Sequence, residues 1–282
     1  MIDLAALQAA FPEVSAIQLI HTTSGQRYVF RVDHAGAPAV LKIVKRGLVD
    51  LARVQREIEA VQRLNSAYVP QIISSGLRQV AADDQVFILE RFIEGYSYRE
   101  KLRAMAVQDV GDVIVLIEAL LYACRDFETA KIVHRDIKPD NLIIGNDGKV
   151  WVIDFGIVRH LDLQSLTADG LYGGIGTLGY AAPEQFQNIK ADINVRADLF
   201  GLGVVAYEAL AGFNPYLRGL HSSQAVIKRM ETETIPILAI PGDTAGVFGK
   251  FIASLIQRFP SRRPQTASEA IHWFETVKQQ YP

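Results

Sequence analysis

The sequence predicts an α+β fold in which a sheet-forming N-terminal part precedes a larger, mainly helical part. The predicted strands, which are β-like segments, are 17–22, 27–33, 39–44, 76–80 and 86–89. Apolar residues at helical spacing predict a helix at 51–64, and strongly apolar runs predict helices at 110–127 and 199–210. Further helix candidates are 222–230, 244–257 and 266–279. A chain of 282 residues can form two compact lobes. We expect one domain with lobes at 1–91 and 92–282.

The composition indicates an ordinary globular protein, with 49% hydrophobic and 21% charged residues. Because 29 basic residues face 31 acidic ones, no polyanion-binding surface is predicted, and we expect no nucleic-acid partner. The single cysteine, Cys124, excludes an internal disulfide and is expected to be buried. The N-terminus has no basic leader and Glu118 interrupts the apolar run before it, so we expect a cytoplasmic protein without a membrane segment.

A predicted hairpin places an amide and a carboxylate together. Residues 142–144 and 150–153 are apolar, β-prone runs, and the turn-forming sequence 145–148, Gly-Asn-Asp-Gly, joins them. Pairing these strands brings Asn141, just before the first, close to Asp154, just after the second. Oxygen ligands of this kind suit a hard cation such as Mg²⁺.

A loop with further polar groups precedes the hairpin. Asp136 lies five residues before Asn141, where it can accept a proton from an incoming hydroxyl group. Lys138, in the same loop, can face a phosphoryl group during its transfer. The loop and the hairpin together therefore predict phosphoryl-transfer chemistry.

Residues 134–141, His-Arg-Asp-Ile-Lys-Pro-Asp-Asn, and 154–156, Asp-Phe-Gly, resemble two motifs of the eukaryotic-type, or Hanks-type, serine/threonine protein kinases. Residues 176–184 resemble the family's substrate-facing loop, which ends in Ala-Pro-Glu. The resemblance covers all but about fifteen N-terminal residues and implies the bilobal protein-kinase fold, with a small antiparallel sheet and C-helix before a helical lobe. The sequence Ala-Ala-Pro-Glu-Gln is similar to bacterial members, which suggests a bacterial or phage kinase domain standing alone.

The resemblance assigns roles to individual residues. Asp136 would act as catalytic base, Lys138 would neutralise the transferring group, and Lys42 would bind the α- and β-phosphates of ATP. Asn141 and Asp154 would bind Mg²⁺, with Mn²⁺ as an alternative. The other expected ATP-site residues are Glu57 as the partner of Lys42, Val40 over the adenine, Glu90, Phe92 and Gly25.

Two segments depart from the family pattern. The glycine-rich loop has Thr22, Ser24 and Arg27 where glycines are expected, and only Gly25 lies nearby. Glycine allows backbone N–H groups to approach phosphates closely, so we expect ATP to bind under a more ordered loop. An ungapped alignment puts Glu90 at the gatekeeper position, where a charge is unusual, and a one-residue shift is the alternative.

The resemblance also predicts regulation. Arg56, Arg135 and Arg159 occupy positions that can converge on a phosphorylated activation loop, and Thr167 is our favoured acceptor. The alternative is that these arginines line a solvated surface. Thr177 is expected to hydrogen-bond the catalytic loop, a structural role that outweighs its being a phosphorylation site.

Three further residues have architectural roles in the resemblance. His134 is expected to be a packed core imidazole, and Asp198 is expected to anchor the catalytic loop from a buried helix. Arg263 is expected to pair with Glu184 of the Ala-Pro-Glu motif.

The predicted activity is Mg-ATP-dependent transfer of the γ-phosphoryl group to a protein serine or threonine, with autophosphorylation. Lys138 supports the serine/threonine class, because tyrosine kinases typically place Ala and Arg in this loop. A pseudokinase scaffold that binds nucleotide weakly is one alternative, supported by the altered glycine loop. A small-molecule phosphotransferase is the other, although it would lack the segment that ends in Ala-Pro-Glu.

Overall fold

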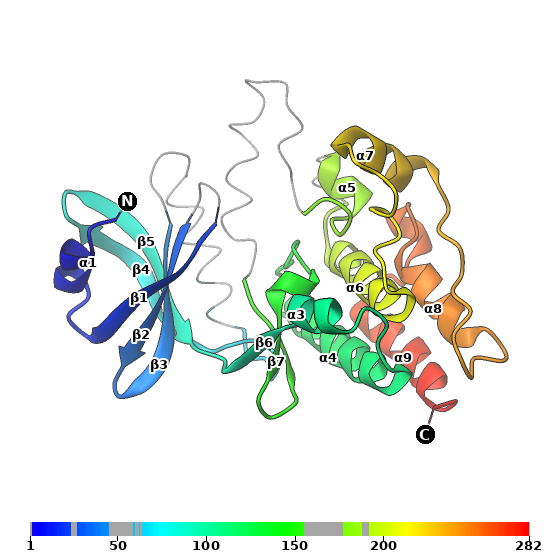
Figure 1. Cartoon of the computed structure of the whole chain (residues 1–282), viewed down its shortest axis with the longest axis horizontal. Coiled ribbons are helices and arrows are strands. Elements are labelled where there is room, and N and C mark those ends of the chain that lie inside the picture. Colours follow the sequence, from blue (N-terminus) through cyan, green and yellow to red (C-terminus); the bar gives the residue numbers. More distant parts are fainter. Residues whose placement is uncertain are drawn as a thin grey trace. The chain divides into compact units, whose positions relative to one another are not determined.

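The chain divides into two compact units. The computed structural model describes residues 2–23, 27–44, 59, 62, 64–154, 177–187 and 192–281. Among them, residues up to 62 and 70–93 belong to unit 1, and residues 64–69, 94–154, 177–187 and 192–281 belong to unit 2. Unit 1 is built on an antiparallel sheet and unit 2 is mainly helical (Figure 1), so the predicted α+β class is confirmed.

A five-stranded sheet forms unit 1, with strand order β1-β2-β3-β5-β4. Its strands are β1 (Val14–Thr23), β2 (Arg27–His34), β3 (Ala37–Val44), β4 (Ile72–Val80) and β5 (Asp83–Arg91). All neighbouring strands run antiparallel. Each predicted strand is therefore present, and most extend beyond their predicted ends because backbone pairing continues past the apolar residues that mark a strand in the sequence.

A two-residue turn sets the register of β2 and β3. Ala35 and Gly36 both have positive φ, +51° and +79°, as the tightest hairpin turns require. His34 therefore faces Ala37, and pairing continues in register along both strands, so that Val29 faces Lys42. The turn thus determines the position of Lys42 within the sheet.

One face of this sheet carries the core of unit 1. Phe30, Leu41 and Leu89 are almost fully buried there, and α1 (Leu4–Ala10) covers them with Leu7. Asp3 caps this helix by accepting a hydrogen bond from the backbone N–H of Ala5 at 3.0 Å. The sequence analysis missed α1, because a helix this short has too few apolar positions to show a period.

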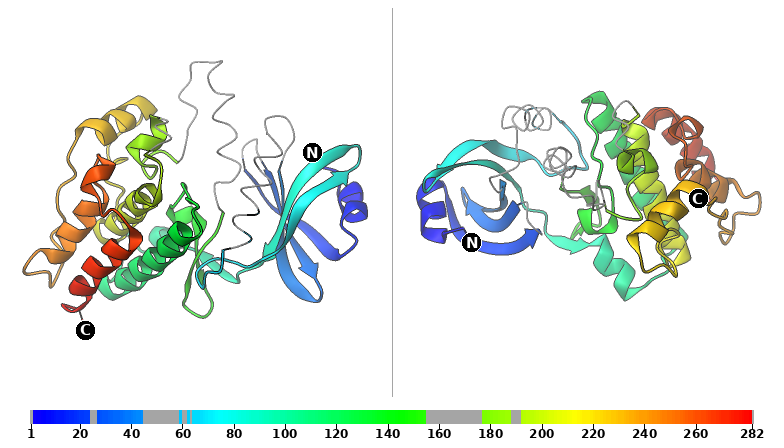
Figure 2. Two further views of the ribbon diagram at one scale, coloured as in Figure 1. Left: turned by 180° about the vertical axis from the view of Figure 1, so that it is seen from behind. Right: turned by 90° about the horizontal axis from the view of Figure 1, so that it is seen from above.

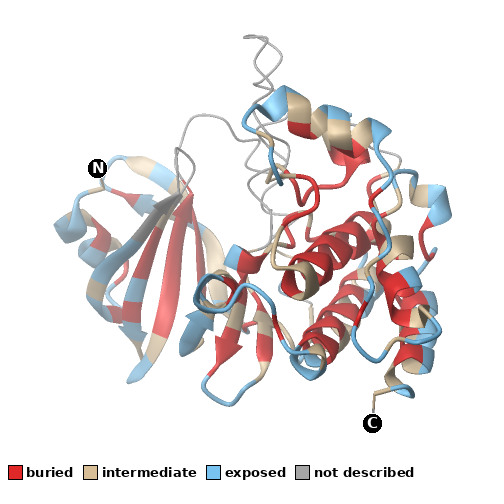
Figure 3. Ribbon diagram, turned by 45° about the vertical axis from the view of Figure 1, so that its right-hand side comes forward, coloured by how far each residue is buried: buried red, intermediate tan, exposed pale blue. Residues whose placement is uncertain are grey.

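Unit 2 is organised around two buried helices. Its helices are α3 (Tyr98–Ala104), α4 (Val110–Thr129), α5 (Pro183–Phe186), α6 (Val195–Ala211), α7 (Ser223–Thr232), α8 (Val247–Leu255) and α9 (Ala267–Lys278). Helices α4 and α6 lie side by side in the views of Figure 2 and share the main core cluster. Helix α6 is buried along most of its length (Figure 3), and Gly212 ends it with a φ of +78°.

A small sheet holds the predicted hairpin. It contains β6 (Gly95–Ser97), β7 (Leu142–Gly145) and β8 (Val150–Val152), in that order. Leu142 faces Val152, which confirms the hairpin. Gly95 must be glycine at the edge of this sheet, because a Cβ atom would lie 2.0 Å from the carbonyl oxygen of Ile144. The hairpin places Asn141 and Asp154 at the same end of the two strands.

Cys124 is fully buried in α4, as expected, and burial raises the pKa of its thiol well above the usual value. Within the described part of the chain, we find no helix whose length and apolar character would allow it to cross a membrane.

Candidate active site

The buried carboxylate of Asp198 fixes the backbone of the loop at 134–141. It accepts hydrogen bonds from the backbone N–H groups of His134 at 2.8 Å and Arg135 at 2.7 Å. Burial in α6 raises the pKa of the Asp198 carboxyl to about 7, although the two N–H groups oppose this shift. The predicted anchoring role of Asp198 is confirmed.

Arg135 adopts a strained backbone conformation that needs this support. Its φ is +65°, in the left-handed region, where a residue with a Cβ atom costs about 1 kcal/mol. Asp198 holds its N–H group, and the side-chain amide of Gln185 donates to its carbonyl oxygen at 2.9 Å. The loop is thus held from both sides, and the reversal at Arg135 directs the chain into Asp136.

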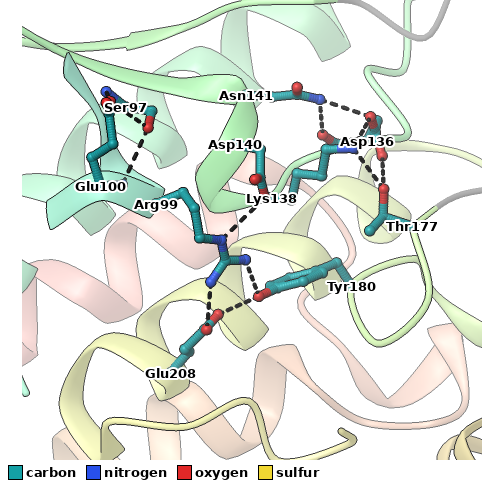
Figure 4. A network of polar contacts seen from close by, with 10 residues as sticks. All are labelled: Ser97, Arg99, Glu100, Asp136, Lys138, Asp140, Asn141, Thr177, Tyr180 and Glu208. Atoms are coloured by element: carbon teal, nitrogen blue, oxygen red, sulfur yellow. Dashed lines mark hydrogen bonds and ion pairs between the residues drawn. The ribbon is translucent and has the colours of Figure 1, made fainter. Parts of the chain in front are cut away.

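Four predicted residues meet in one hydrogen-bonded cluster (Figure 4). The ammonium of Lys138 lies 3.1 Å from Asp136 Oδ2 and donates to Thr177 Oγ1 at 2.7 Å. The Thr177 hydroxyl in turn donates to Asp136 Oδ1 at 2.9 Å. Asn141 Nδ2 donates to the backbone oxygen of Asp136 at 2.8 Å and to its Oδ2 at 2.7 Å. We refer to Asp136, Lys138, Asn141 and Thr177 as the catalytic-loop cluster.

Hydrogen bonds to Asp136 fix the orientation of the Asn141 side chain. Because its nitrogen faces Asp136, its amide oxygen points away from that carboxylate (Figure 4). The backbone N–H of Ile153 donates to the backbone oxygen of Asn141 at 2.9 Å, which places the next residue, Asp154, beside it. Asp154 has a φ of +64°, a conformation that aspartate adopts more readily than most residues.

These donors fit a hard divalent cation, which prefers amide and carboxylate oxygens. No group of three or more His, Cys, Asp or Glu side chains suited to a metal occurs among the residues described. A cation at Asn141 and Asp154 would therefore complete its shell with phosphate oxygens and water, as Mg²⁺ commonly does.

His134 lies beside the cluster but is a core residue. Its side chain is fully buried, stacks on Phe127 with ring centroids 5.8 Å apart, and contacts the carbonyl oxygen of Ile153 at 3.0 Å. Burial lowers the pKa of the imidazole to about 4. The predicted packing of His134 is confirmed, and Asp136 is left as the better candidate for a base near neutral pH.

In unit 1, Lys42 lies on β3 and its side chain is 7% exposed. Its ammonium forms an ion pair with Glu90 of β5. The sequence analysis named both residues but missed this contact. Their relation was visible only through the strand pairing, in which Val40 faces Glu90.

Two of the remaining predicted nucleotide-site residues, Val40 and Phe92, belong to the described part of unit 1. Val40 is 9% exposed, and the guanidinium of Arg31 lies 5.1 Å from the ring centroid of Phe92. The backbone N–H of Phe92 donates to the carbonyl oxygen of Pro38 at 3.3 Å. The expected lysine partner Glu57 and the loop residue Gly25 lie outside the described residues.

A second polar network lies next to the catalytic-loop cluster. Arg99 of α3 donates to Asp140 at 3.3 Å and to Glu208 of α6 at 2.8 Å, and it also bonds the hydroxyl of Tyr180 (Figure 4). The Tyr180 hydroxyl donates to Glu208 as well. The network ties the turn that follows Thr177 to α3, α6 and the catalytic loop. The sequence analysis missed it, because Arg99 belongs to no motif.

The predicted pair of Arg263 and Glu184 is confirmed. The guanidinium makes two hydrogen bonds to the carboxylate, at 2.6 and 2.9 Å, and both side chains are almost fully buried. Arg263 Nη1 also donates to the backbone oxygen of Arg196 in α6 at 2.9 Å. The Ala-Pro-Glu segment is thereby attached to the core of unit 2.

Comparison with known families identifies the chain. A model of the protein kinase domain matches residues 23–274. The chain belongs to the protein kinase domain family. Membership of this family implies the use of ATP and a divalent metal ion.

Two similar curated proteins come from bacteria. The kinase domain is 32% identical to the probable serine/threonine-protein kinase PknB of Bifidobacterium longum, over 83% of this chain and 35% of that protein. It is 30% identical to the serine/threonine-protein kinase PknL of Mycobacterium tuberculosis, over 76% of this chain and 51% of that protein. The chain thus spans only about a third to a half of the length of these relatives.

The predicted regulatory residues of the kinase domain are only partly described. Arg135 has the loop position given above, and Thr177 belongs to the catalytic-loop cluster. Arg56, Arg159 and Thr167 lie outside the described residues. Regulation by a phosphorylated activation loop stays a prediction.

Proposed function

We propose that the chain is a Mg-ATP-dependent serine/threonine protein kinase that transfers the γ-phosphoryl group to a protein hydroxyl and phosphorylates itself. The observation that carries the proposal is the catalytic-loop cluster, which holds a carboxylate, an ammonium, an amide and a hydroxyl within hydrogen-bonding distance. The bacterial relatives are named as serine/threonine-protein kinases, which supports the serine/threonine class.

The proposed roles follow from the chemistry of each side chain. Asp136 accepts the proton of the acceptor hydroxyl, because its carboxylate is held in one orientation by Asn141 and Thr177. Lys138 offsets the negative charge of the transferring phosphoryl group. Lys42 binds the α- and β-phosphates, as the family resemblance implies.

Asn141 and Asp154 are proposed to hold Mg²⁺ through their side-chain oxygens. When bound, the cation neutralises charge on the phosphates and lowers the barrier to their displacement. Mn²⁺ has the same preference for oxygen ligands and is the proposed alternative.

Radiolabelled ATP with Mg²⁺, a generic protein acceptor and an Asp136→Asn control tests the proposal. We expect label on serine and threonine of the acceptor, added phosphate on the kinase domain by intact mass, and loss of both in the variant. Nucleotide binding without transfer would indicate a pseudokinase, and label on a small molecule alone would indicate a small-molecule phosphotransferase. Equal transfer by the variant and the wild type would refute the role of Asp136.

A further inference from the structure

An ion pair occupies the sheet face of unit 1 that lies opposite its core. In the antiparallel pairing of β3 and β5, Val40 faces Glu90 and Lys42 faces Ile88. Alternate residues of a strand share a face, so Lys42 and Glu90 are diagonal neighbours on one face. Their long side chains bridge this diagonal, and Lys42 Nζ contacts Glu90 Oε1.

The pair lies among apolar side chains. Val29, which faces Lys42 on β2, and Val40, Val44, Val86 and Ile88 are each at most 9% exposed. The side chains of the pair are only 7% and 13% exposed. Water therefore screens the two charges little, and the carboxylate offsets the cost of burying the ammonium.

The register of the sheet fixes the distance between the two charges. The two-residue turn between β2 and β3 sets the position of Lys42 in the sheet. The pairing of β3 with β5 sets the position of Glu90. The pairing of the strands thus sets where both side chains leave the backbone.

We propose that Glu90 is a positioning residue for Lys42, whose ion pair with it holds the ammonium in one place for the phosphates of ATP. This inference rests on the proposed function, because that function assigns Lys42 to the phosphates. An ammonium carries three N–H donors, so a bond to Glu90 and bonds to phosphate oxygens can coexist. Glu90 therefore acts through Lys42 and has no need to contact the nucleotide.

Glu90→Gln tests the proposal, since it keeps the shape of the side chain and removes its charge. The readout that needs no catalysis is the rate at which an amine-acylating reagent modifies Lys42, followed by peptide mass spectrometry. Loss of the ion pair leaves the amine freer to react, so this rate should rise about tenfold. Glu90→Asp, which keeps the charge but shortens the side chain by a methylene, should raise it about threefold.

Steady-state kinetics provide the second readout. Glu90→Gln should lower kcat/KM for ATP about tenfold and leave the KM for the protein acceptor unchanged. Asp84→Asn, an exposed change on the same strand, is the matched control and should alter neither readout. Melting curves followed by circular dichroism show whether each variant folds. If Glu90→Gln fails to fold, the proposal is tested with Glu90→Asp.

The outcomes separate the two proposals. An acylation rate and a kcat/KM of Glu90→Gln within twofold of the wild type overturn the positioning role while the kinase activity stands. A loss of thermal stability without faster acylation of Lys42 also overturns it, because Glu90 then contributes only to folding. If Lys42 is acylated faster in Glu90→Gln but the wild type transfers no phosphate, the result supports the ion pair and refutes the proposed function.

Discussion

The hydroxyl of Thr177 connects the two charged groups of the catalytic loop, and its removal gives a sharp prediction. Thr177 Oγ1 accepts from Lys138 at 2.7 Å and donates to Asp136 at 2.9 Å. Thr177→Val has nearly the same volume and shape but makes neither bond. The direct contact of Lys138 with Asp136 at 3.1 Å remains in this variant.

The magnitude follows from the charges on both partners. A hydrogen bond to a charged group contributes about 1.5–3 kcal/mol. If the variant loses the equivalent of one such bond in the transition state, kcat falls by about 10- to 150-fold. Because Asp136 and Lys138 are each still held by another contact, we do not expect the loss of both bonds to add fully.

The assay is transfer of radiolabel from ATP to a protein acceptor at saturating ATP, with Thr177→Ser as the matched control. Serine keeps the hydroxyl, so its kcat should stay within about fivefold of the wild type. A valine variant within threefold of the wild type would refute the reasoning, as would equal losses in both variants. Phosphorylation of Thr177 would remove its hydroxyl proton, so phosphate at this position should lower activity.

Three further predictions concern the surrounding structure. Arg263→Met leaves the buried carboxylate of Glu184 without its cation and should lower the free energy of unfolding by about 3–5 kcal/mol. The control, Arg262→Met, changes an exposed residue and should alter the melting temperature little. Similar melting curves for the two variants would contradict this prediction. The pKa of His134 is lowered to about 4 in the fold, so the unfolded chain binds a proton below about pH 6.5 that the folded chain does not. On going from pH 7 to 5.5 the wild type should therefore lose about 1 kcal/mol more stability in urea titrations than His134→Phe, and parallel pH profiles would exclude this account. Arg99→Lys keeps the charge but loses the planar guanidinium group that bonds three partners, so kcat/KM for the acceptor should fall about tenfold. Unchanged kinetics would show that the network is not needed for activity.

Local patterns in the sequence predicted most of the elements that the structure describes. The hairpin before Asp154 was predictable because two β-prone runs and a turn of Asn, Asp and Gly residues lie next to one another in the chain. The exact ends of the strands were not predictable from the sequence, because pairing with a neighbouring strand decides where a strand ends. The short helix α1 was not predicted for a related reason. Its seven residues are stabilised by packing on the sheet more than by their own helix propensity.

The candidate site shows the same division. Asp136, Lys138 and Asn141 lie within six residues, so their spacing alone predicted that they act together. Thr177 lies 41 residues from Asp136, and only its motif suggested a contact. Arg99, Tyr180 and Glu208 are far apart in the chain, and no motif connects them.

The sequence by itself determined the protein family, most of the strands and longer helices, and the group of residues at 136–141 proposed for catalysis, because these depend on local spacing and turn chemistry. Only the tertiary structure showed that Lys42 meets Glu90 and that Arg99 meets Glu208. Glu90 contacts Lys42 because β5 pairs with β3 in one particular register, and a shift of one residue would have turned Glu90 to the opposite face of the sheet. Burial then gives that contact its strength, because little water is left to screen the charges.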